Sequence, residues 1–197
     1  EGLINNTPTY YLETGANLIS YPYSQSQELE NALPFYMDNN LIAIIGENEA
    51  ALFINGQNYG SLTHFEPNKG YWFFLNNPIF FEYNLPTEQF SSINYYNTND
   101  DDNISLYNQS TLQSIFFIDK AFINGSILSD DYDISVLCND MQVGGKNWNG
   151  SMTDIVAMGY DGYEFTEGYC EIEQNINIEV SNENITSNMY IIGNSQW

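Results

Sequence analysis

The stretch Gly70-Tyr71-Trp72-Phe73-Phe74-Leu75 is the most informative part of the sequence for the fold. It follows Pro67-Asn68-Lys69-Gly70, a run of residues that is typical of a turn. Side chains alternate between the two faces of a strand, so a strand here places aromatic rings on both faces. Such a strand is typical of the centre of a sheet that is covered on both sides. We therefore predict a central strand in which Tyr71 and Trp72 are core residues rather than a ligand-binding platform.

Short runs of β-branched and aromatic residues of the same kind recur along the whole chain. Turn dipeptides such as Asn55-Gly56, Asn149-Gly150 and Asp161-Gly162 separate them, and this spacing is typical of sandwiches and barrels. The sequence therefore predicts an all-β fold. The predicted strands are Leu41–Ile45, Ala51–Ile54, Tyr71–Leu75, Ile79–Tyr83, Ser114–Ile118, Ile134–Cys138, Asp154–Met158, Ile176–Val180 and Met189–Ile192.

One helix is expected, at 25–33. Ser24 and Gln27 have the spacing of a capping box, Leu29 and Leu33 fall on one face, and Pro34 ends the pattern.

The chain has 197 residues, enough for one or two domains. A polar stretch with the run Asn97-Thr98-Asn99-Asp100-Asp101-Asp102-Asn103 interrupts the apolar pattern near the middle. Such a stretch cannot bury a core, so it indicates a linker or a long loop. We predict two consecutive small β-sandwich-like domains, at 1–86 and 110–197, joined by 87–109.

The charge balance excludes several functions. There are 26 Asp and Glu against 3 Lys and Arg, for a net charge of -23. Binding to nucleic acid or to an anionic membrane needs cationic side chains that this chain lacks. No apolar run approaches the roughly 20 residues of a membrane span. The acidity is compatible with a saline or calcium-containing environment, or simply with a biased residue composition that keeps the protein soluble.

The two cysteines, Cys138 and Cys170, leave two alternatives open: one disulfide, or two buried free thiols. A zinc site is not expected, because the single histidine, His64, lies far from both cysteines in the sequence. The same scarcity argues against a nucleophilic triad or a Cys–His dyad, so we expect a protein that is not an enzyme.

Two segments carry a resemblance to known proteins. The stretches 15–22 (GANLISYP) and 60–72 (GSLTHFEPNKGYW) resemble a module of secreted bacterial surface proteins with a G-x-N-L-I-S-x-P … P-G-K-G-Y-W pattern. The stretch 133–144 (DISVLCNDMQVG) resembles the I-G-A-F-x-N-G module that follows it in such proteins, with Ser135-Val136-Leu137 in place of Gly-Ala-Phe. Similar stretches occur in structural proteins of marine phages. The resemblance implies β-sandwich modules in extracellular or virion chains and transfers no catalytic residues.

Calcium is the best candidate cofactor, because Ca²⁺ prefers carboxylate, amide and carbonyl oxygens. Asp131 and Asp133 alternate in one acidic loop, and Asp161 and Glu164 lie in another. The consecutive acids 100–103 form a third cluster. Solvated loop carboxylates are the alternative for each cluster.

Aromatic residues near turns suggest a second kind of site. Trp148, Asn149, Tyr160 and Tyr163 could stack on sugar rings and hydrogen-bond their hydroxyl groups, with Tyr169 and the pair Tyr95-Tyr96 as further candidates. Ordinary packing or a contact between subunits is the alternative.

These observations predict a non-catalytic structural or adhesion module at an extracellular or virion surface. Its expected partners are further copies of itself or neighbouring structural subunits, or a cell-surface glycan. The alternative is a carbohydrate-binding accessory module of a secreted polysaccharide-degrading enzyme.

Overall fold

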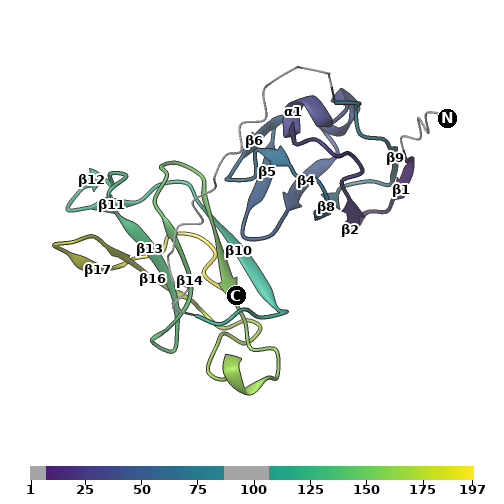
Figure 1. Ribbon diagram of the computed structural model, residues 1–197. Helices are drawn as coiled ribbons and strands as arrows, with labels where there is room; N and C mark the ends of the chain where they lie inside the picture. The colour runs from purple at the N-terminus through teal and green to yellow at the C-terminus, as the bar shows by residue number, and fades with distance from the viewer. Residues whose placement is uncertain (1–7, 87–106) are drawn as a thin grey trace. The chain divides into compact units, whose positions relative to one another are not determined.

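The computed structural model describes residues 8–86 and 107–197 and has an all-β fold (Figure 1). The chain divides into two compact units, Glu1–Asn94 (unit 1) and Tyr95–Trp197 (unit 2). The predicted linker 87–109 lies mostly outside the described residues, as do Tyr95, Tyr96 and the acids 100–103. In the described residues, no helix is long and apolar enough to cross a membrane.

Unit 1 is built on a five-stranded antiparallel sheet in the order β2-β8-β4-β5-β6, accompanied by the small sheets β1-β9 and β3-β7. Its elements are β1 (Tyr10–Leu12), β2 (Gly15–Ser20), β3 (Gln27–Glu28), α1 (Leu29–Ala32), the 3-10 helix η1 (Phe35–Met37), β4 (Leu41–Ile45), β5 (Ala50–Ile54), β6 (Gln57–Tyr59), β7 (His64–Phe65), β8 (Gly70–Leu75) and β9 (Ile79–Phe81).

Strand β8 occupies the position that its sequence predicts, between β2 and β4, but only one of its faces is buried. Tyr71, Phe73 and Leu75 are buried in the core, whereas Trp72 is 44% exposed. The prediction that the strand is covered on both sides, with Trp72 in the core, is therefore wrong. The physical reason is that the buried cluster of unit 1 gathers on the Tyr71 face of the sheet, and Trp72 pairs instead with Leu18, which is 59% exposed.

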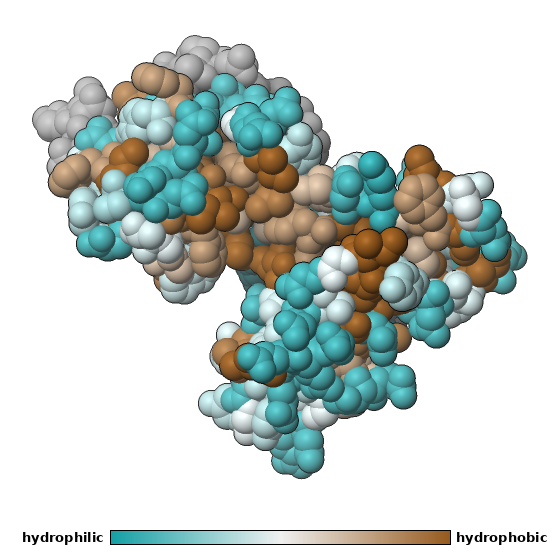
Figure 2. Space-filling view, turned by 180° about the vertical axis from the view of Figure 1, so that it is seen from behind, coloured by the Kyte–Doolittle hydropathy of each residue, from teal (hydrophilic) through white to brown (hydrophobic). Residues whose placement is uncertain are grey.

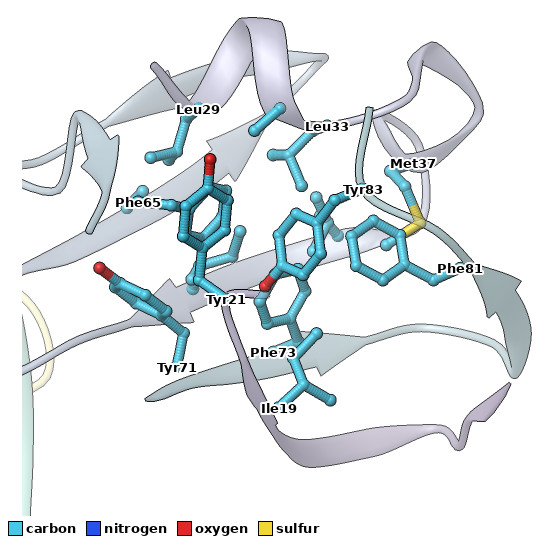
Figure 3. Close-up of a cluster of buried hydrophobic side chains, with 14 of the residues drawn as sticks. Ile19, Tyr21, Leu29, Leu33, Met37, Phe65, Tyr71, Phe73, Phe81 and Tyr83 are labelled. Carbon is cyan, nitrogen blue, oxygen red and sulfur yellow. The ribbon is translucent and has the colours of Figure 1, made fainter. Parts of the chain in front are cut away.

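The core of unit 1 is an assembly of aromatic rings (Figure 3). Phe65 is central: its ring centroid lies 4.9 Å from that of Tyr71 and 5.2 Å from that of Tyr83, both in edge-to-face arrangements. The rings of Tyr83 and Phe81 lie beneath the segment that carries Leu29 and Leu33. Edge-to-face pairs of this kind add stability beyond the burial of their area.

The helix of unit 1 is shorter than predicted. Residues Gln27 and Glu28 form strand β3, and α1 spans only Leu29–Ala32 without a side-chain cap. The predicted capping box does not form because the Gln27 side chain is buried and its Oε1 accepts a hydrogen bond from the Tyr21 hydroxyl (3.0 Å).

Unit 2 contains a four-stranded sheet in the order β14-β13-β16-β17 and the antiparallel pair β10-β15, with a small hairpin β11-β12. Its elements are β10 (Gln113–Ile118), β11 (Phe122–Ile123), β12 (Ser126–Ile127), β13 (Asp133–Cys138), β14 (Met141–Asn147), β15 (Thr153–Met158), the 3-10 helix η2 (Glu164–Thr166), β16 (Asn177–Ser181) and β17 (Thr186–Met189).

Specific cross-links, together with a mostly aliphatic core, hold unit 2 together. Cys138 and Cys170 form a disulfide, which resolves the alternative that the sequence left open. Lys146 Nζ lies 3.1 Å from Asp154 Oδ1, and the Asp154 side chain is almost fully buried. Gly144 lets β14 pass close to β15, because a Cβ there would clash with the Val156 carbonyl oxygen.

Candidate functional site

The candidate site is the loop that follows β15, at 159–170, where aromatic side chains reach the surface. It includes the short helical turn η2, the light green coil of unit 2 in Figure 1. Two of the predicted ligand-binding residues, Tyr160 and Tyr163, lie on this loop and are exposed.

Asp161 fixes the loop with both of its carboxylate oxygens. Oδ2 accepts hydrogen bonds from the Thr111 backbone N–H (2.9 Å) and the Thr111 hydroxyl (3.1 Å). Oδ1 accepts one from the Thr166 hydroxyl (2.7 Å). These donors, with the Thr111 backbone N–H first, hold the pKa of the Asp161 carboxyl well below its usual value, because they stabilise the charged form.

The fixed loop presents two stacked rings to solvent. The rings of Tyr163 and Phe165 are nearly parallel (6°), with centroids 5.4 Å apart, and the side chains are 59% and 55% exposed. Gly162 between Asp161 and Tyr163 has a φ of +91°, a conformation that favours glycine, and it allows the chain to turn into η2. We call Tyr160, Tyr163 and Phe165 the aromatic loop cluster.

The base of the loop is closed by covalent and backbone contacts. The disulfide ties Cys170 to the end of β13, and the Tyr160 backbone N–H donates to the Cys170 carbonyl oxygen (2.9 Å). Next to the disulfide, the Asn108 backbone N–H donates to the hydroxyl of Tyr169 (2.7 Å), whose side chain is buried. The aromatic loop cluster therefore stands on a loop that is restrained at both ends. Tyr169, a further sequence candidate, helps to hold the loop rather than to present a ring.

Trp148 does not offer the exposed ring that sugar stacking would require. It is 2% exposed, and its Nε1–H donates to the Leu128 carbonyl oxygen (3.1 Å), which satisfies the indole inside the core. Asn149 is exposed in the turn between β14 and β15, where its backbone N–H donates to Thr153 Oγ1. Because β15 separates this turn from Tyr160, the structure does not bring Asn149 to the aromatic loop cluster.

The four predicted metal ligands lie in two separate places. Asp131 precedes β13 and Asp133 is its first residue, whereas Asp161 and Glu164 lie near the disulfide at the other end of that strand. The Asp131 carboxylate accepts hydrogen bonds from the Ser129 hydroxyl and from Asn182 Nδ2, and these bonds lower its pKa. The Asp161 carboxylate already accepts hydrogen bonds from Thr111 and Thr166.

No group of three or more His, Cys, Asp or Glu that could hold a metal ion occurs in residues 8–86 and 107–197. The third acidic cluster, 100–103, is outside the described residues. Calcium binding stays a prediction.

The single histidine lies in unit 1, on the surface. His64 Nε2 is 4.0 Å from Glu28 Oε1, and its Nδ1 is 2.9 Å from the Thr63 hydroxyl oxygen. Both cysteines are in the disulfide, so neither offers a thiolate to pair with this ring.

Sequence reasoning missed three residues of the site: Phe165, which completes the stack, and Thr111 and Thr166, which hold Asp161. The signal for Thr166 was present, because Asp161-Gly162 is a typical start of a side-chain-stabilised turn. The role of Thr111 depends on a tertiary contact 50 residues away and leaves no local pattern.

Comparisons of this chain with protein-family models, with curated proteins and with solved structures found no match. The resemblance to secreted surface modules and phage structural proteins therefore stays a prediction.

Proposed function

We propose that this chain is a non-catalytic structural or adhesion module of an extracellular or virion surface assembly. The observation that carries the proposal is the stacked, exposed pair Tyr163 and Phe165 on a loop that Asp161 and the disulfide restrain. In the described part of unit 2, neither ring belongs to the buried core cluster, and both are more than half exposed.

Exposed aromatic side chains are typical anchors of protein interfaces. Tyr and Trp are enriched among the residues that dominate binding energy, because they bury a large area at a small loss of conformational freedom. A loop that is already fixed before binding loses less entropy when its partner arrives. The aromatic loop cluster meets both conditions.

Unit 1 supplies a second apolar surface. The outward row Leu18, Trp72 and Ile45 crosses three neighbouring strands of the five-stranded sheet and contains no charged residue. Apolar residues, brown in Figure 2, reach the surface of both units. In a chain with a net charge of -23, contacts between copies meet the least repulsion on such uncharged patches.

The disulfide supports an extracellular location, because disulfides persist mainly in oxidising compartments and outside cells. A virion surface exposes a protein to the same conditions. This argument concerns the environment and is independent of the identity of the partner.

The test is the assembly state of the full chain in saline buffer, by light scattering after size exclusion and by electron microscopy. We expect oligomers, particles or filaments that Tyr163→Ala/Phe165→Ala reduces to monomers. The control is Phe80→Ala, which removes another exposed ring, in unit 1. Monomers at all concentrations, or assemblies that the double variant leaves unchanged, would contradict assembly through the aromatic loop cluster.

The alternative function, a carbohydrate-binding accessory module, is favoured by the same rings, since exposed Tyr160 and Tyr163 can stack on sugar rings. Retention of a monomeric chain on a polysaccharide column, lost in the double variant, would favour this alternative over assembly.

A further inference from the structure

A groove in unit 1 lies far along the chain from the aromatic loop cluster and has no part in the proposed function. It has a volume of about 700 Å³, within the range of small-ligand sites. One wall is the segment from α1 to η1, and the other includes the hairpin turn that joins β5 and β6. Leu29, Leu33 and Phe53 provide its apolar lining.

The two walls meet at a tight turn. Asn55 and Gly56 have φ values of +53° and +77°, as a two-residue hairpin turn requires. A Cβ on Gly56 would lie 3.9 Å from the Asp38 Cβ, so this turn sits directly against the Asp38 side chain. Asp38, next to η1, and Asn58, on β6, are both lining residues of the groove.

One of the lining residues of the groove, Phe35, has an aromatic ring that is almost fully exposed. Phe35 is 86% exposed, the largest exposure of any phenylalanine in the described residues. Its only described ring neighbour is Tyr36, edge-on at 6.0 Å and 76°, so neither face of the Phe35 ring is stacked on a described ring. A phenylalanine that buries so little of itself is a candidate stacking surface.

The charge of the groove selects the ligand. Glu30 and Asp38 line it, and its described lining includes no Lys, Arg or His. Together with the net charge of -23, these carboxylates repel anions and attract cations. A second copy of this chain is an unsuitable occupant, because its surface carries the same negative charge.

We propose that this groove binds a protonated amino sugar of the glucosamine type, as a unit of a polysaccharide. The apolar face of the sugar ring stacks on Phe35, the ammonium group pairs with Asp38 and Glu30, and the hydroxyl groups bond to the Asn58 amide. A flat, free ring together with an amide favours a sugar over a bare ammonium group, and the carboxylates favour an amino sugar over a neutral one.

The test compares two probes of equal length and linkage, a glucosamine tetramer and a glucose tetramer. Binding to the full chain is measured by calorimetry at a mildly acidic pH that keeps the amines protonated and the carboxylates ionised. We expect the glucosamine tetramer to bind at least roughly tenfold more tightly, with an affinity that falls as salt is added. Phe35→Ala should weaken it roughly tenfold without any change in charge.

Matched variants separate the groove from general attraction to an acidic protein. Asp38→Asn should weaken binding far more than Asp130→Asn, which removes one exposed carboxylate from unit 2. Phe80→Ala controls for Phe35→Ala. Equal losses in Asp38→Asn and Asp130→Asn would show non-specific attraction and overturn the proposal.

Two further outcomes would also overturn it. One is equal affinity for the two tetramers. The other is equally Phe35-dependent binding of spermidine, which carries ammonium groups but no sugar ring. Binding lost in Tyr163→Ala/Phe165→Ala but retained in Phe35→Ala would place the glycan in unit 2, so failure here is distinguishable from failure of the proposed function.

Discussion

The cores of the two units are stabilised in different ways. Unit 1 buries a cluster of rings around Phe65 and contains no disulfide in its described part. Unit 2 has a largely aliphatic core, closes it with the Cys138–Cys170 disulfide and the Lys146–Asp154 ion pair, and leaves Tyr163 and Phe165 outside.

This difference indicates which rings are available for binding. A ring of the buried cluster around Phe65 cannot be removed without opening a cavity, whereas an exposed ring such as Phe35 can be removed without one. In unit 2, a disulfide and an ion pair contribute to the stability of the fold. Rings at a loop tip of this unit are therefore not needed for packing.

Removal of a core ring from unit 1 should be the most damaging change. Phe65 is fully buried and contacts Tyr21, Tyr71, Phe73 and Tyr83. Phe65→Ala should lower the free energy of unfolding of unit 1 by about 3–5 kcal/mol, through lost burial and a residual cavity. Urea unfolding measures the change. The exposed-ring variant Phe80→Ala should cost less than about 1 kcal/mol. Equal losses in Phe65→Ala and Phe80→Ala would contradict the distinction between core rings and exposed rings.

Loss of the disulfide should destabilise unit 2 and spare unit 1. The bridge joins residues 32 apart in the sequence. A loop of that length gives about 3–4 kcal/mol of stabilisation through restriction of the unfolded chain. In Cys138→Ser/Cys170→Ser, hydrogen exchange should accelerate in β13 and β16 but not in β4 and β8. Unchanged protection in unit 2 would show that its other contacts suffice.

The pH dependence of unit 2 should report on Asp161. Its pKa is depressed in the folded state, so its stabilisation is fully present above the usual carboxyl pKa near 3.8 and is lost as the pH falls through the lower folded value. The melting temperatures of the wild type and Asp161→Ala should therefore differ at neutral pH and converge in acid. Asp130→Ala measures the background effect of losing one negative charge. A difference that is constant with pH would contradict this account.

The smallest effect is expected at the hydroxyl of Tyr83. It is buried and has no hydrogen-bond partner among the described residues, and burial raises the Tyr83 pKa. Tyr83→Phe removes an unsatisfied polar group, so stability should stay within about 1 kcal/mol of the wild type or increase.

The matched control for Tyr83→Phe is Tyr21→Phe, which breaks the hydrogen bond to Gln27 and should cost about 1 kcal/mol. A larger loss in Tyr83→Phe than in Tyr21→Phe would show that the Tyr83 hydroxyl is satisfied.

Local patterns predicted several strands closely, but the predicted strand Met189–Ile192 is wrong, because β17 spans Thr186–Met189 and Ile192 is exposed. The run Leu41–Ile45 coincides with β4, and the fold class follows from such runs. Strand β14 was missed because Gly144 and Gly145 interrupt its pattern. At Gly144 the close approach of β15 leaves no room for a side chain. No sequence period could reveal that one face of β8 stays open, because coverage depends on what packs against it.

The candidate site was predicted in part. Turn signals drew attention to Tyr160 and Tyr163, which the structure places at the surface. The same reasoning chose Trp148, since proximity to a turn does not distinguish an exposed ring from one whose indole is satisfied inside the core. The hydrogen bonds from Thr111 to Asp161 join residues 50 apart and required the tertiary structure.

The most direct test of the division between core rings and free rings is the free energy of unfolding of Tyr163→Ala/Phe165→Ala, by urea titration of the full chain. We predict a change below about 1 kcal/mol, as for other surface substitutions. A loss of about 3–5 kcal/mol, the cost of a buried ring, would show that these residues hold unit 2 together and would contradict their availability for a partner.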